Sequence, residues 1–357
     1  MVGFDITFPE PDRSIRDLLA PIDLETLGEG FNTTLAEIEP QIDSDKFFAN
    51  VMQSGIDVVL AINFNPQTDA RYNELPDSIV DIAPELAAGI TVQDMSGFTG
   101  NIKVLQDAAL GNGSMNQAPD ADGLVRRVPL VIRFGESLYP TLSLEMFRVY
   151  NFLESYQLVT QNYNGLEVVT AVRLGSGAGA FEIPTDGLGQ VIVPYVGDSS
   201  LLNDRYFPYI SATDVLQDNL TDSEREALTN SLVLVGTSAP GLGDIRAMPL
   251  QQVYPGVEVH ANMLNALLNS VSVVDVQAGL GGWWAFCPDP CTGSQSVNVI
   301  SLSGCCVNGC DFAHACCCSG VVQFSAVGGL SVRFQSGSDA AVDSAGHRYE
   351  PHLWLSF

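Results

Sequence analysis

Ser238, Asp244 and His260 are the residues of this sequence whose types and order could most readily do chemistry. Ser238 lies in a glycine-rich loop after the apolar segment 232–235, and His260 is the only histidine in the first 275 residues. A serine, an acid and a histidine in this order occur in hydrolases whose nucleophile sits on a turn between a strand and a helix. One interpretation is therefore a serine hydrolase that uses these three residues.

The hydrolase motif is incomplete. Pro240 replaces the last glycine of the strand-to-helix turn, and only sixteen residues separate Asp244 from His260, whereas triad members come from different strand ends. A lone histidine near a helix start more often makes a structural hydrogen bond than acts as a base. We therefore expect a binding module and not an enzyme, with serine hydrolysis as the alternative.

The elements around these residues predict where they lie. A buried strand at 232–235, a glycine-rich loop at 236–243, a turn at 254–256 and a helix starting near His260 form one βα unit. This order gathers the polar groups at the carboxyl end of the strand. Ligands tend to bind at that place in open α/β sheets. The sequence thus predicts a site there, without deciding whether the site reacts or only binds.

A second polar set lies in the segment 120–127. Residues 120–123 form a tight turn of the Asp-Gly type, and Arg126 and Arg127 precede an apolar run. Strand alternation predicts that one arginine faces solvent and the other faces the sheet, where its guanidinium must meet a carboxylate. We expect that pairing to be structural. The predicted ligand-binding residues are Asp122, Arg126, Asp244 and His260.

No cofactor or metal is expected. The loop 236–243 lacks the Gly-Lys-Ser/Thr ending of a phosphate-binding loop. The glycine-rich run 175–180 is followed by more strand and not by a helix, which predicts a hairpin connection. No second histidine accompanies His260 in this region to form a metal site.

Composition indicates a folded protein and excludes some partners. The 357 residues are 46% hydrophobic, with mean hydropathy +0.17. The net charge of −27 repels phosphate backbones, so nucleic-acid binding is not expected. No apolar run is long enough for a membrane helix, and the N-terminus does not resemble a signal peptide.

Alternating strands and amphipathic helices predict an α/β fold: a largely parallel sheet flanked by helices in a single domain at residues 1–275. The expected strands are 56–64, 232–235 and a short set within 166–196. The expected helices are 46–54 (capped by Ser44 or Asp45), 140–150, 211–216 and 221–230, the last with a Thr221–Glu224 capping box. Residues 111–119 are expected to form a polar loop.

Several ordered blocks together resemble the CHASE2 domain. They are VGFDITFPEPD (2–12), DADGLVRRVPLVIRFGESLYPTLSLEMFR (120–148), VIVPYVG (191–197), LVLVGTSAPGLGDIRAMPL (232–250) and YPGVEVHANML (254–264). The resemblance carries over by position to Asp5, Asp122, Gly123, Arg126, Pro129, Pro140, Tyr195, Gly197, Gly236, Asp244, Pro249, Gly256 and His260.

The resemblance implies a bacterial sensory domain, usually extracytoplasmic and flanked by membrane helices. Such domains are joined to cyclase or kinase output domains in the cytoplasm, and their ligands are largely undefined. The implied partners are a small-molecule or protein signal, the membrane helices, a cytoplasmic effector and a second copy in a homodimer. The implied location is the periplasmic or outer face of the inner membrane.

The sequence departs from the family pattern at both ends. CHASE2 domains normally begin with a membrane helix, a strand and a helix before the segment that resembles residues 2–9. We therefore expect an incomplete start that leaves a core strand unpaired. After the helix of His260, where membrane helices should follow, the chain instead gives all eight of its cysteines, between Cys287 and Cys318.

The cysteine-rich tail at 276–357 fits neither a familiar zinc spacing nor the α/β pattern. A disulfide framework is a second interpretation, suited to an oxidising compartment. A third interpretation also accounts for the missing membrane helices, because leucine codons read one base later give cysteine codons. We therefore expect the tail to be a membrane segment translated out of frame.

Overall fold

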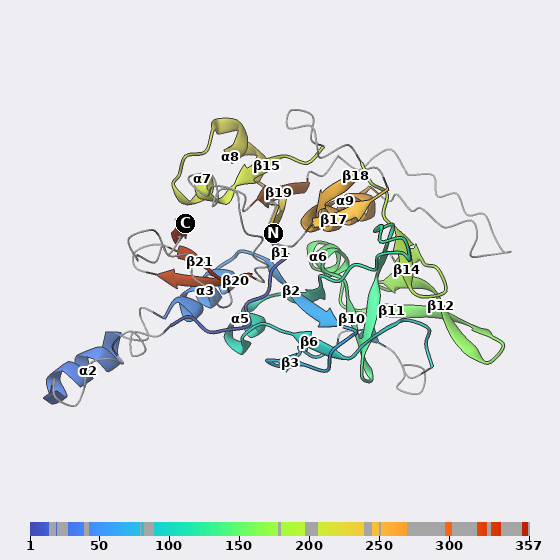
Figure 1. The fold of residues 1–357 in the computed structure, drawn as a ribbon, viewed down its shortest axis with the longest axis horizontal. Helices are drawn as coiled ribbons and strands as arrows, with labels where there is room; N and C mark the ends of the chain where they lie inside the picture. The colour runs from blue at the N-terminus through green and yellow to red at the C-terminus, as the bar shows by residue number, and fades with distance from the viewer. Residues whose placement is uncertain are drawn as a thin grey trace.

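The fold is mixed α/β around one eight-stranded sheet (Figure 1). A computed structural model describes residues 1–13, 19, 28–38, 43–78, 80–81, 89–177, 180–196, 206–238, 245–249, 251–269, 297–301, 320–326, 330–336 and 352–355. The strand order is β15-β19-β16-β1-β2-β6-β3, and β7 also pairs with β2. These strands are β1 (Val2–Phe4), β2 (Val58–Asn65), β3 (Arg71–Tyr72), β6 (Gly97–Thr99), β7 (Gly111–Ser114), β15 (Tyr209–Ser211), β16 (Leu232–Gly236) and β19 (Val297–Ser301).

The centre of the sheet is parallel. β1 pairs in parallel with β16 on one side and with β2 on the other, and β7 and β19 join in parallel as well. β6 runs antiparallel to β2. The expectation of an unpaired core strand is therefore not met at β1, which is bonded along both edges.

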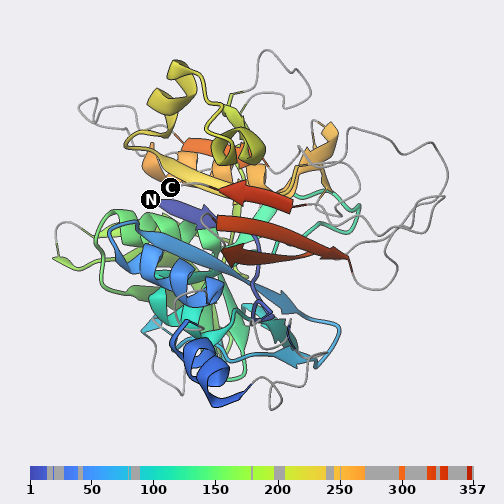
Figure 2. The same cartoon turned by 90° about the vertical axis from the view of Figure 1, so that its left-hand side faces the viewer.

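Smaller sheets surround the main one, and most of their pairs are antiparallel. Their strands are β4 (Val80–Asp81), β5 (Gln93–Met95), β8 (Arg127–Pro129), β9 (Val131–Phe134), β10 (Ser137–Pro140), β11 (Tyr156–Tyr163), β12 (Leu166–Leu174), β13 (Phe181–Pro184), β14 (Gln190–Ile192), β17 (Ile245–Met248), β18 (Gln251–Pro255), β20 (Gly320–Ala326), β21 (Leu330–Ser336) and β22 (His352–Leu355). β20, β21 and β22 form a three-stranded sheet (Figure 2). β12 and β13 form the hairpin predicted around residues 175–180.

Helices cover both faces of the main sheet. They are α2 (Gly28–Ile38), α3 (Ser44–Gln53), α5 (Lys103–Ala108), α6 (Leu142–Tyr150), α7 (Ala212–Leu216), α8 (Asp222–Leu228) and α9 (Gly256–Leu268). α3, α5 and α7 share a buried apolar cluster with one face of the sheet, and α6 and α9 share another cluster with the opposite face. Figure 1 shows α2 lying apart from these layers.

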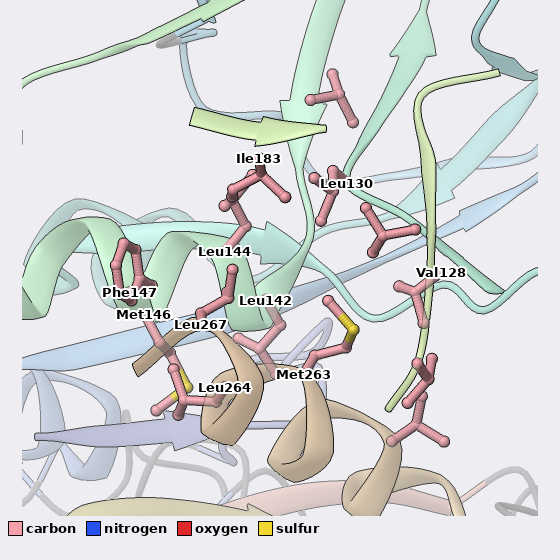
Figure 3. Packing of buried hydrophobic residues seen from close by; sticks show 14 of the residues in the cluster. Val128, Leu130, Leu142, Leu144, Met146, Phe147, Ile183, Met263, Leu264 and Leu267 are labelled. Carbon is pink, nitrogen blue, oxygen red and sulfur yellow. The ribbon is translucent and has the colours of Figure 1, made fainter. Parts of the chain in front are cut away.

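The sequence of β2 suits its central place. Val58, Val59, Leu60, Ala61 and Ile62 are all buried, and alternate residues of this run enter the two apolar clusters. A strand that is apolar on both sides is typical of a sheet covered by helices on both faces. Figure 3 shows the α6–α9 side, where Leu264 and Leu267 of α9 lie near Met146 of α6.

Glycines let the helices approach this side of the sheet closely. A Cβ atom on Gly113 would lie 2.6 Å from the Cα atom of Leu142 in α6. A Cβ atom on Gly236 would lie 2.6 Å from the Cβ atom of Val257 in α9. Real Cβ atoms do not tolerate such distances, so only glycine fits at these places.

Three expected helices are present with adjusted bounds, whereas the expected cap of one of them (Ser44 or Asp45) and one expected loop are wrong. The helix expected at 140–150 starts at Leu142 with Thr141 as its cap, and the capping box of Thr221 and Glu224 is present. The helix expected at 46–54 starts earlier, because the side chain of Asp43 caps it by accepting from the Lys46 amide. The expected loop at 111–119 instead begins with strand β7.

Candidate functional site

The candidate site lies where the strand order reverses direction. From β1 the chain builds β2 and β7 on one side of the sheet, and it later adds β15 and β16 on the other. In open α/β sheets, ligands bind beyond the carboxyl ends of the strands at such a switch point. Asp5 follows β1 at that edge, and Ser238 follows β16.

His260 and Asp5 meet at this edge. The His260 Nε2 atom lies 3.6 Å from the Asp5 Oδ1 atom, and both side chains are buried. Neither ring nitrogen of His260 makes a well-formed hydrogen bond within the described part of the chain, although the backbone of Met115 lies close enough to favour the protonated ring. α9 begins at Gly256, so His260 lies in its second turn and not at its start as expected.

Burial controls the charge of His260. It lowers the pKa of the imidazole to about 4, because the charged ring would lose its hydration. The nearby backbone of Met115 opposes this shift, and the positive charge of Arg246 adds to it. His260 is therefore neutral at pH 7, with one nitrogen that can donate and one that can accept.

Gln117 is a further polar residue at this edge. Its Nε2 atom donates to the backbone oxygen of Gly256 at 3.0 Å, which ties the segment after β7 to the first turn of α9. Its buried Oε1 atom has no hydrogen-bond partner in the described residues. Sequence reasoning missed Gln117 because it lies in a segment expected to be a polar loop.

A polar network holds α9 in place through Glu258 and Asn262, two residues before and two residues after His260. Asn262 accepts from the amide of Val196 at 2.7 Å and donates to the hydroxyl of Tyr254 at 2.7 Å. The Tyr209 hydroxyl donates to the carboxylate of Glu258. Burial, with the charge of Glu258, raises the pKa of Tyr254, so its phenol stays protonated. The orientation of His260 is therefore fixed by its neighbours on the helix.

Asp122 and Arg126 lie together, bound to one another. The Arg126 guanidinium makes two parallel hydrogen bonds to Asp122, at 2.9 and 2.8 Å, and a third to Asp120 at 2.8 Å. Arg127 also contacts Asp120, at 3.1 Å. The prediction that one arginine points inward is wrong, since both are partly exposed and share a carboxylate. The predicted structural pairing is present.

The predicted site residues therefore fall into two groups and a remainder. His260 pairs with Asp5, which was absent from the predicted set although its place directly after a strand was a usable signal. Asp122 pairs with Arg126, in the segment before β8. Asp244 lies outside the described residues.

The described geometry does not support the hydrolase interpretation. A serine nucleophile needs a histidine within hydrogen-bond reach, and neither nitrogen of His260 bonds to Ser238. The ring is fully buried, and its pKa of about 4 makes it a weak base.

The described residues contain no group of three or more histidine, cysteine or acidic side chains placed to hold a metal ion. None of their helices is both long and apolar enough to cross a bilayer. The cysteines between Cys287 and Cys318 lie outside the described part, so their predicted interpretations are untested.

A family model for the CHASE2 domain matches residues 1–288. The chain belongs to the CHASE2 family. CHASE2 domains are extracytoplasmic sensory domains, which agrees with a sensing role and with the expectation of a non-catalytic chain. No curated protein and no solved structure matches the chain. The CHASE2 match includes both residues of the buried pair, Asp5 and His260.

Proposed function

We propose that this chain is the signal-receiving module of a bacterial transmembrane receptor and that its receiving centre is the sheet edge around Asp5 and His260. One observation carries the proposal: a fully buried histidine at the switch point has neither ring nitrogen in a well-formed hydrogen bond, with only the backbone of Met115 close enough to favour its protonated form. Buried polar groups of this kind are rare in folded proteins and call for a functional explanation. Membership of a sensory family supplies the context.

The output of the receptor follows from the position of α9. This helix carries His260, begins at the candidate site and ends at Leu268, which packs against the same apolar cluster as Met1. A change at the site can therefore reach the opposite end of the sheet through one rigid element. We propose that membrane helices receive this change and pass it to a cyclase or kinase domain in the cytoplasm. In this proposal the domain lies on the outer face of the inner membrane and functions as a homodimer.

Ligand-dependent stabilisation tests the receiving role. The chain would be melted with a panel of amino acids, organic acids, sugars and polyamines, each at millimolar concentration. A ligand at one hundred times its dissociation constant adds about 2.7 kcal/mol to the free energy of unfolding. We expect at least one compound to raise the melting temperature saturably in the wild type, and to lose that effect in Asp5→Asn and His260→Asn.

The matched control is Arg173→Gln, which breaks an exposed ion pair with Glu182 on the β12–β13 hairpin. This variant should keep the full ligand effect. A panel without any saturable effect, or effects that survive both site substitutions, would count against the proposed site.

Sequencing the gene tests the coupling. Reading upstream of codon 1 and onward from about codon 270 should reveal frames that encode membrane helices, followed by a cyclase or kinase domain. The same reads test whether the cysteine-rich tail is a frame-shifted membrane segment. The structure places residues 297–301 of that tail in the main sheet as β19. A single frame with stop codons on both sides would contradict the coupling.

A further inference from the structure

The buried histidine at the switch point is costly to keep. His260 is completely inaccessible to solvent, and neither of its nitrogens makes a well-formed hydrogen bond with a described residue; the backbone of Met115 gives it only partial compensation. An apolar side chain of similar size would fill the space without that cost. The ring therefore has a use that its packing alone does not explain.

The charged groups that face His260 come from two elements. The Asp5 carboxylate approaches from the end of β1, with its Oδ1 atom 3.6 Å from Nε2. Arg246 acts on the ring from β17 through its positive charge. On α9 itself, the Glu258 carboxylate accepts from the Tyr209 hydroxyl.

The charged groups of α6, the other helix on this face, belong to a different place. Glu145 and Arg148 bind one another, and Arg148 also donates to the backbone oxygen of Leu153 just after the helix. They pack beside Gly111, at the start of β7, whereas the segment that contacts His260 follows the end of β7. Asp5 is thus the described acidic residue nearest to the imidazole.

We propose that acidification is a signal this domain receives, with His260 as the group that takes up the proton and Asp5 as its counter-ion. This inference rests on the proposed receiving role of the same site and names its signal. The proton comes from solvent and binds the free ring nitrogen, so the imidazole changes from neutral to a single positive charge.

Protonation changes what the ring can bind. The neutral ring has one donor and one acceptor, whereas the protonated ring has two donors. At 3.6 Å the Asp5 oxygen is just beyond the usual hydrogen-bond length, so a short movement of α9 toward β1 would form a charge-assisted bond. The Oε1 atom of Gln117 is a second buried acceptor, on a side chain already tied to the first turn of α9.

The neutral state is the resting state. Burial holds the pKa of His260 at about 4, so the ring is uncharged near pH 7 and takes up a proton only in acid. The attached helix carries a natural reporter, because the buried side chain of Met263 lies one turn beyond His260 and packs in the α6–α9 cluster (Figure 3).

Methyl NMR of methionine-labelled protein tests the proposal. Spectra of the full chain would be recorded from pH 7.5 to pH 3. We expect the Met263 and Met115 methyl signals to shift together along a one-proton curve with its midpoint near pH 4 to 5. His260→Asn should abolish the curve. Asp5→Asn should lower its midpoint by about one pH unit, because the stabilising anion is gone.

Asp45→Asn is the matched control. Asp45 lies in α3 on the opposite face, and burial raises its pKa to about 6, so it titrates in the same range of pH. The Met263 curve should survive this substitution. If the wild type unfolds before pH 4, the part of the curve above that point still reports the effects of the site variants.

Two results would overturn the proposal. One is a Met263 signal that does not move before unfolding. The other is a curve that persists in His260→Asn. If either occurs while a compound still stabilises the chain through Asp5 and His260, the receiving site stands and only the proton as its signal is refuted.

Discussion

The strongest stability prediction concerns the hydroxyl of Tyr156. Glu145 is fully buried in α6, and its carboxylate accepts from the Tyr156 hydroxyl at 2.5 Å and from Arg148 at 2.9 and 2.8 Å. Burial and the charge of Glu145 raise the pKa of Tyr156, so the phenol remains a donor at all ordinary pH values. Hydrogen bonds to charged groups contribute about 1.5–3 kcal/mol. Tyr156→Phe should lower the free energy of unfolding by that amount.

Glu145→Gln should lower the free energy of unfolding by more than Tyr156→Phe does. It leaves the Arg148 guanidinium, whose side chain is only 14% exposed, without its anion. Breaking a buried pair in this way costs about 3–5 kcal/mol. Because Tyr156 acts on the same carboxylate, the double variant should lose less than the sum of the two single losses.

Urea unfolding followed by circular dichroism is the assay. The transition midpoint should move while the slope with denaturant stays constant, because the surface exposed on unfolding is unchanged. Tyr163→Phe is the matched control, since that side chain is 70% exposed at the tip of the β11–β12 hairpin. A Tyr156→Phe variant within about 0.5 kcal/mol of this control would refute the network as a source of stability.

Three further predictions concern other parts of the fold. Gly113→Ala should lower the free energy of unfolding by about 1–3 kcal/mol in urea unfolding, because the new methyl group meets the backbone of Leu142. An unchanged free energy of unfolding would contradict the close approach. Thr221→Ala should cost about 1 kcal/mol by removing a capping box, and Thr221→Ser should restore most of it. His260 has a folded pKa of about 4 against 6.5 when unfolded, so the unfolded chain takes up its proton first as the pH falls. Relative to His260→Asn, the wild type should lose about 2 kcal/mol of stability between pH 7.5 and pH 5 in urea titrations. A wild type that gains stability over that interval would show that attraction to Asp5 outweighs burial.

The elements that sequence reasoning found are those with local signals. The capping box of Thr221 and the side-chain cap of Thr141 are short patterns whose chemistry is independent of the rest of the fold. The apolar run of β16 is also a local signal, and it predicts the strand correctly. Asp122 and Arg126, four residues apart, form a pair that the sequence also brings close.

The features that could not be predicted from the sequence depend on the order of the strands in the sheet. The residues Gly111–Ser114 have low strand propensity, and they form β7 because glycine alone fits against α6. The Asp5–His260 contact joins the two ends of the matched region, and nothing short of the strand order places them side by side. The β17–β18 hairpin was also not predicted, because the sequence indicated only a turn at 254–256.

The glycine-lined face of the sheet also limits how the domain can move. Where Gly113 and Gly236 lie against α6 and α9, there is no room even for a methyl group. A tightly packed layer of this kind resists compression and lets few side chains change rotamer independently. At its first turn, α9 therefore has little freedom to repack against the sheet, and a displacement near His260 would move the helix as one body.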